Sequence, residues 1–189
     1  MSRIQTVLFD WAGTIIDWGS VAPVFAFRAV FERFAVAISE AEARGPMGKS
    51  KREHIQSIFA MPAVQERFVA GKGRPSTEAD VDVLYENFIP TQLDVLATCS
   101  TLLPGVPALA DTLRSRGIRI GTSTGYSTEL DQFNRRAAAA QGFVPDAGVC
   151  ASDVRRGRPA PDMLWTLALE LGTTSVLESI ALDDTPMGI

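Results

Sequence analysis

The sequence predicts an α/β fold in which a parallel β-sheet core is interrupted by a long helical insert. Short apolar segments alternate with segments of helical periodicity at both ends of the chain, which is typical of a parallel sheet with helices on its faces. Residues 20–100 instead show apolar residues at helical spacing and no convincing strand. We therefore expect a core domain formed by residues 1–19 and 101–189, and a helical domain formed by residues 20–100.

The predicted strands are short, and the first sets the pattern for the others. Residues 4–10 (IQTVLFD) form an apolar run that ends at the carboxylate of Asp10 and is followed by a turn of small residues. The later strands are expected at residues 118–122, 147–150 and 179–182. Helices are expected at residues 106–116, 128–140 and 161–171 of the core and, in the insert, at residues 21–36, 49–60 and 77–99.

The composition narrows the class of protein. Hydrophobic residues make up 46% of the 189 residues, charged residues make up 21%, and the formal net charge is −4. These values exclude a disordered chain and a basic surface for nucleic acid. Cys99 and Cys150 lack metal-site spacing, and no secretion signal or membrane span is evident, so we expect reduced thiols and a cytoplasmic protein. The chain ends just beyond its fourth expected strand, and we expect it to be truncated there.

Chemically active side chains gather at the carboxyl ends of the four predicted strands, the edge at which parallel α/β sheets bind ligands. They are Asp10, Ser123-Thr124-Gly125, Gly157-Arg158-Pro159, and Asp183-Asp184. Carboxylates suit Mg²⁺, a guanidinium and a hydroxyl suit phosphoryl oxygens, and one carboxylate can attack phosphorus. The set therefore predicts phosphoryl transfer.

These motifs resemble those of the haloacid dehalogenase superfamily, and within it the phosphonoacetaldehyde hydrolase (phosphonatase) family. The matching segments are DWAGT, EARGPMGKSKREHI, TSTGYS, GRPAP and DDTPMGI, which together extend over essentially the whole chain. The resemblance implies a Rossmann-like core with an inserted helical cap, a requirement for Mg²⁺, and a homodimer. It also implies hydrolysis of phosphonoacetaldehyde to acetaldehyde and phosphate in phosphonate catabolism.

Two features of the chain fit cleavage of a carbon–phosphorus bond. Most phosphatases of this superfamily place an acidic residue two positions after the nucleophile to protonate an alkoxide, whereas this chain has Ala12 there. Cleavage to carbon leaves a carbanion instead, and a lysine imine with the neighbouring aldehyde can accept the electron pair. The resemblance places this Schiff base at Lys51, with Lys49 as the rival, and His54 lies three residues after Lys51 as a candidate proton shuttle.

The resemblance also implies roles for the remaining residues. Asp10 is the nucleophile, and Mg²⁺ is held by Asp10, the backbone carbonyl of Ala12 and Asp184, with Asp183 as a further candidate ligand. The expected substrate-binding residues are Thr124, Gly125, Tyr126, Arg158, Gly48 and Met47. Two alternatives remain open: a phosphatase or phosphomutase of the same superfamily that acts on a small phosphate ester, and an inactive remnant.

Overall fold

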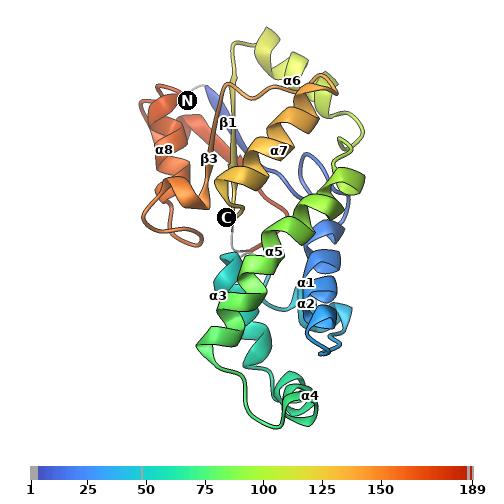
Figure 1. Ribbon diagram of the computed structural model, residues 1–189. Helices are drawn as coiled ribbons and strands as arrows, with labels where there is room; N and C mark the ends of the chain where they lie inside the picture. The colour runs from blue at the N-terminus through green and yellow to red at the C-terminus, as the bar shows by residue number, and fades with distance from the viewer. Residues whose placement is uncertain (1–3, 48, 187, 189) are drawn as a thin grey trace. The chain divides into compact units, whose positions relative to one another are not determined.

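The computed structural model describes residues 4–47, 49–186 and 188, and it contains a parallel sheet, helices around it and a helical insertion (Figure 1). The chain divides into two compact units. The core unit comprises the residues up to Gly19 together with those from Cys99 onward, and the helical unit comprises Ser20–Thr98. The core unit therefore resumes at Cys99, whereas the sequence analysis expected it to resume at residue 101.

In the part of the chain that the structure describes, the core sheet has four strands in the order β3-β2-β1-β4, and all neighbouring strands are parallel. The strands are β1 (Thr6–Asp10), β2 (Arg119–Thr124), β3 (Ala147–Cys150) and β4 (Ser179–Leu182). Because the strands are parallel, their carboxyl ends meet at one edge, which brings Asp10 beside the end of β2. The predicted α/β fold is therefore confirmed.

Helices cover both faces of the sheet, and the alternation of side chains along β1 explains why. Val7 and Phe9 pack in a cluster with α6 (Val106–Ser115) and α7 (Thr128–Ala139). Leu8 points to the opposite face and packs against α8 (Asp162–Glu170). Burying each such side chain contributes about 1.5–3 kcal/mol, so the two clusters hold the sheet between its helices. Two short 3₁₀ segments, η1 (Ala151–Asp153) and η2 (Val176–Glu178), complete the loops around α8.

Among its described residues, the helical unit has five helices around an aromatic core. They are α1 (Val21–Arg33), α2 (Glu40–Arg44), α3 (Lys51–Phe59), α4 (Pro62–Lys72) and α5 (Glu78–Cys99). Local signals set several of their ends: Ser39 and Glu42 form a capping box at α2, and Gly73 adopts a left-handed conformation at the end of α4. Within the described part of the chain, no helix combines the length and the apolar character needed to cross a membrane.

Candidate active site

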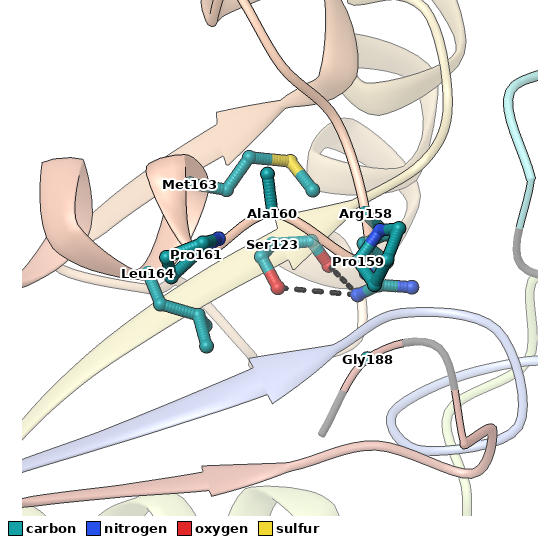
Figure 2. Close-up of a pocket in the computed structure, with 8 residues that line it drawn as sticks. All are labelled: Ser123, Arg158, Pro159, Ala160, Pro161, Met163, Leu164 and Gly188. Atoms are coloured by element: carbon teal, nitrogen blue, oxygen red, sulfur yellow. Dashed lines mark hydrogen bonds between the residues drawn. The ribbon is translucent and has the colours of Figure 1, made fainter.

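Arg158 connects two of the acidic residues that the sequence analysis selected. Its Nη2 donates to Asp10 Oδ1 at 2.7 Å and lies 2.8 Å from Asp183 Oδ2. The same nitrogen donates to Ser123 Oγ at 3.2 Å, and Figure 2 shows this hydrogen bond joining the two side chains. The three charged side chains are at most one tenth exposed, so their interactions are only weakly screened by solvent. The structure thus brings together residues from β1, β2, the loop after η1 and the end of β4.

Ser123 is the site residue that sequence reasoning did not single out by itself. It is the register partner of Asp10 in the parallel pair of β1 and β2. Paired positions of a parallel sheet point their side chains to the same face, so Ser123 Oγ lies on the side of Asp10. The sequence showed hydroxyls at both Ser123 and Thr124, but only the strand register distinguishes them.

The three carboxylates have the chemistry of a divalent-cation site. Asp10, Asp183 and Asp184 each offer an oxygen atom within 4.8 Å of the others, and carboxylate oxygens are ligands that Mg²⁺ accepts. Thr185 orients Asp183, because its backbone N and its Oγ1 both donate to Asp183 Oδ1 at 2.8 Å. Desolvation by burial raises the pKa of Asp10 from 3.8 to about 7, against the opposing attraction of Arg158 and with further repulsion from the other two carboxylates. A bound cation would relieve this repulsion, so the residues present fit the metal.

A pocket of about 90 Å³ opens beside Arg158 and Ser123. Its other walls come from the segment that leads into α8 and from Gly188, as Figure 2 shows. These further lining residues are Pro159, Ala160, Pro161, Met163 and Leu164. The pocket therefore has one charged and hydroxylated wall opposite an apolar one, an arrangement that suits a small ligand with one anionic group.

The remaining predicted substrate-binding residues of the core lie at the end of β2. Thr124 is buried, and its Oγ1 accepts a hydrogen bond from the backbone N of Tyr126 at 3.2 Å. Tyr126 is itself buried, and Gly125 lies between them in the turn that leads to α7. This turn keeps the end of β2 compact beside Asp10. Ala12 lies in the turn after β1, where it forms an isolated bridge with Ile16.

In the helical unit, Lys51 and Lys49 have opposite surroundings. Lys51 is 9% exposed, and its Nζ lies 5.7 Å from the ring centroid of Phe27 and 6.0 Å from that of Phe88. Lys49 instead donates to Ser57 Oγ at 2.9 Å on the exposed side. Lys51 is the first residue of α3, whereas Lys49 precedes the N-cap Ser50 and lies outside the helix. Met47 packs against the same aromatic core as Phe27, whereas Gly48 lies outside the described residues.

His54 is fully buried next to Lys51. Its ring stacks on Phe27 with 3.8 Å between centroids, and its Nε2 lies 2.8 Å from the carbonyl oxygen of Ala43. Because a carbonyl only accepts, Nε2 carries the proton in the neutral ring. Desolvation and, to a smaller extent, the charges of Lys51 and Lys49 together lower the pKa of His54 from 6.5 to about 3. His54 is therefore a neutral donor at physiological pH.

This pKa shift predicts that the helical unit loses stability in mild acid. The unfolded chain binds a proton at His54 below pH 6.5, but the folded chain resists protonation down to about pH 3. The stability is therefore complete above pH 6.5 and falls by up to about 1.4 kcal/mol per pH unit below it. Urea denaturation followed by circular dichroism between pH 7.5 and 5 measures this slope. His54→Gln keeps an amide donor and does not titrate, so it should flatten the slope; an unchanged slope would contradict the assignment.

Comparisons with known proteins identify the family. Residues 4–189 match the family model for haloacid dehalogenase-like hydrolases. A phosphonoacetaldehyde hydrolase from Paraburkholderia phytofirmans is 46% identical over all 189 residues, which span 71% of that relative. The chain belongs to the phosphonoacetaldehyde hydrolase family of the haloacid dehalogenase-like hydrolases. A phosphonoacetaldehyde hydrolase from Bacillus cereus is 38% identical over 97% of this chain and 69% of its own length.

Solved structures agree with this membership of the haloacid dehalogenase-like hydrolases. A phosphonoacetaldehyde hydrolase-like protein from Oleispira antarctica has a TM-score of 0.96 and 40% identity, covering all of this chain and 68% of that one. A β-phosphoglucomutase from Clostridium difficile has a TM-score of 0.75 at 20% identity, covering 99% of this chain and 79% of that one. The second likeness concerns the fold alone. Proteins that share a fold can have different activities, so the activity has to be inferred from the residues of the site.

Proposed function

We propose that this protein hydrolyses the carbon–phosphorus bond of phosphonoacetaldehyde, releasing acetaldehyde and phosphate. The observation that carries the proposal is the burial of Lys51 among the rings of Phe27 and Phe88 and beside neutral His54. A phosphatase needs no buried amine, and it does need an acid where this chain has Ala12. The names of the similar hydrolases support the same substrate.

The proposed reaction uses two nucleophiles, which attack the aldehyde carbon and the phosphorus on either side of the substrate's methylene carbon. Lys51 Nζ adds to the aldehyde carbon, and loss of water gives a protonated imine. A carboxylate oxygen of Asp10 then attacks phosphorus, the carbon–phosphorus bond breaks, and its electron pair moves into the imine to form an enamine. Protonation of the enamine carbon regenerates an imine, for which His54 is the candidate proton carrier. One water hydrolyses the aspartyl phosphate and another hydrolyses the imine, which restores both side chains and balances the reaction.

The other residues of the site hold the phosphonate group. The guanidinium of Arg158 and the hydroxyl of Ser123 lie beside Asp10, and we propose that they bind the negatively charged phosphoryl oxygens. We propose Thr124, Gly125 and Tyr126 as further binding residues, since they form the turn at the end of β2. In the helical unit, Met47 and Gly48 are proposed from the family as further substrate-binding residues.

The proposed Mg²⁺ ligands are Asp10, the carbonyl oxygen of Ala12 and Asp184, with Asp183 as a further ligand. When bound, Mg²⁺ supplies positive charge that offsets the repulsion between the phosphoryl oxygens and the attacking carboxylate. Arg158, which pairs with Asp10 and Asp183 in the structure, is then available to the phosphonate oxygens. A homodimer, a cytoplasmic location and a place in phosphonate catabolism are proposed from the family.

Borohydride trapping tests the proposed function. The protein is incubated with phosphonoacetaldehyde and Mg²⁺, reduced, digested and analysed by peptide mass spectrometry. We expect a reduced two-carbon adduct on Lys51, because borohydride converts the imine to a stable secondary amine. An adduct on Lys49 would keep the activity and correct the residue. No adduct, combined with turnover of a simple phosphate ester, would replace the proposal by a phosphatase.

A further inference from the structure

The residue directly after the nucleophile is anchored far from the reacting atoms. Trp11 follows Asp10, is 0% exposed, and packs edge-on against Phe143 with 6.0 Å between ring centroids. Its indole Nε1 donates a buried hydrogen bond to Asp131 Oδ1 at 3.0 Å. Asp131 lies on α7, 120 positions later in the chain, so this bond connects the turn after β1 to a helix on the face of the sheet.

The backbone of Trp11 organises the turn that presents the site residues. Its carbonyl oxygen accepts from the backbone N of Thr14, Ile15 and Ile16, at 3.3, 2.8 and 3.0 Å. Residue 11 is therefore held at both ends, by its backbone within the turn and by its indole on α7. Within this packed surrounding, a shift of the indole can rotate the peptide unit, and with it the directions of the Asp10 carboxylate and the Ala12 carbonyl.

Burying the carboxylate of Asp131 costs free energy, which packing alone would not require. It is buried, and desolvation raises the pKa of its carboxyl group despite the opposing charge of Arg135. Arg135 Nε donates to Asp131 Oδ2 at 2.6 Å, which leaves Oδ1 directed at the indole. The guanidinium of Arg135 lies over Gly148 on β3, where a Cβ atom would come within 2.6 Å of Cζ. Because Gly148 has no side chain, it leaves space for the guanidinium of Arg135. An apolar residue at position 131 would fill the same volume without burying a charge, so packing alone does not explain Asp131.

We propose that Asp131 is a positioning residue, which acts through the indole N–H of Trp11 to hold the turn that presents Asp10 and the Ala12 carbonyl for the reaction. The inference rests on the proposed function, because it assumes that Asp10 is the nucleophile. Asp131 contacts neither the substrate nor the reacting atoms in this role. Its effect should appear in kcat rather than in KM, since the turn orients the attacking group and the pocket around Arg158 binds the phosphonate.

Three variants and one matched control test the role. Asp131→Asn keeps an oxygen acceptor for the indole, Asp131→Leu removes it at similar volume, and Trp11→Phe removes the donor but keeps an aromatic ring. Glu129→Leu on the exposed side of α7 removes a carboxylate from the same helix and is the control. We expect Asp131→Leu and Trp11→Phe to lower kcat by about tenfold or more, at saturating Mg²⁺ and well below the melting temperature. Asp131→Asn should recover most of this loss.

The double variant shows whether the two residues act together. If Asp131 acts through the indole, adding Asp131→Leu to Trp11→Phe should lower kcat no further. An unchanged kcat in a cooperatively melting Asp131→Leu protein would overturn the proposal and leave Asp131 a structural residue. If Asp131→Leu does not fold, Trp11→Phe decides the question alone, and an unchanged kcat there overturns the proposal equally.

A spectroscopic measurement separates this inference from the proposed function. Trp18 and Trp165 are 78% and 59% exposed, so replacing both by phenylalanine leaves buried Trp11 as the fluorescent reporter. In this background, Asp131→Leu should raise acrylamide quenching about twofold, whereas Asp131→Asn and Glu129→Leu should not. Unchanged quenching would refute the anchoring. Quenching as expected, in a protein that does not turn over phosphonoacetaldehyde, would keep the anchoring and refute the proposed function.

Discussion

We expect Lys51→Arg to lower kcat/KM for phosphonoacetaldehyde by roughly a thousandfold or more, because a guanidinium keeps the positive charge but does not form the imine. Without the imine, the electron pair of the breaking carbon–phosphorus bond has no acceptor. Release of acetaldehyde, coupled to a dehydrogenase, measures the loss. The same variant should show no two-carbon adduct after borohydride reduction.

Lys49→Arg is the matched control for this prediction. Lys49 lies two residues before Lys51, but its Nζ bonds Ser57 on the exposed side of the helix. We therefore expect its activity to stay near that of the parent. Full activity of Lys51→Arg would remove the imine mechanism, and a loss in Lys49→Arg alone would move the Schiff base to Lys49. Both substitutions keep the positive charge, so we expect both variants to fold. A cooperative thermal melt of each variant excludes unfolding as the cause of a lost activity.

Asp10→Asn should reduce turnover by about ten-thousandfold, since an amide oxygen does not attack phosphorus as a carboxylate does. It should also weaken the binding of Mg²⁺, because one of the three carboxylates that lie within 4.8 Å of one another is lost. A ligand that binds only the folded state at 100 times its Kd adds about 2.7 kcal/mol of stability. Adding Mg²⁺ should therefore raise the Tm of the parent several degrees and that of Asp10→Asn much less.

The fold of the Asp10→Asn variant should survive without metal. Arg158 keeps its ion pair with Asp183, and the substitution removes a charge that burial disfavours, as the raised pKa of Asp10 indicates. Asp111→Asn, on the exposed side of α6, is the matched control and should behave as the parent in both assays. An equal rise of Tm with Mg²⁺ in the parent and in Asp10→Asn would place the cation elsewhere.

Most of the core could be predicted from local patterns. Apolar runs predict the strands that lead to Asp10 and Asp183, although β1 is buried and β4 is mostly exposed. Gly117 and Gly172 mark where helices end. These signals depend on residues close in sequence. The sequence analysis did not predict α2 and α4 as separate helices. The start of α2 depends on the cap at Ser39, and the start of α4 depends on Pro62 in its first turn.

The sequence by itself determined that carboxylates, an arginine and hydroxyls meet at one edge of a parallel sheet, because strand direction alone puts all strand ends there. Only the tertiary structure decided which of them touch. Ser123 rather than its neighbour faces Arg158 because of the register between β1 and β2. Lys51 rather than Lys49 is buried because α3 begins at Lys51 and packs it beside Phe27, whereas Lys49 precedes the helix. Trp11 and Asp131 are 120 positions apart, and no local pattern joins them. Contacts of this kind depend on packing between distant segments, which periodicity along the chain does not encode.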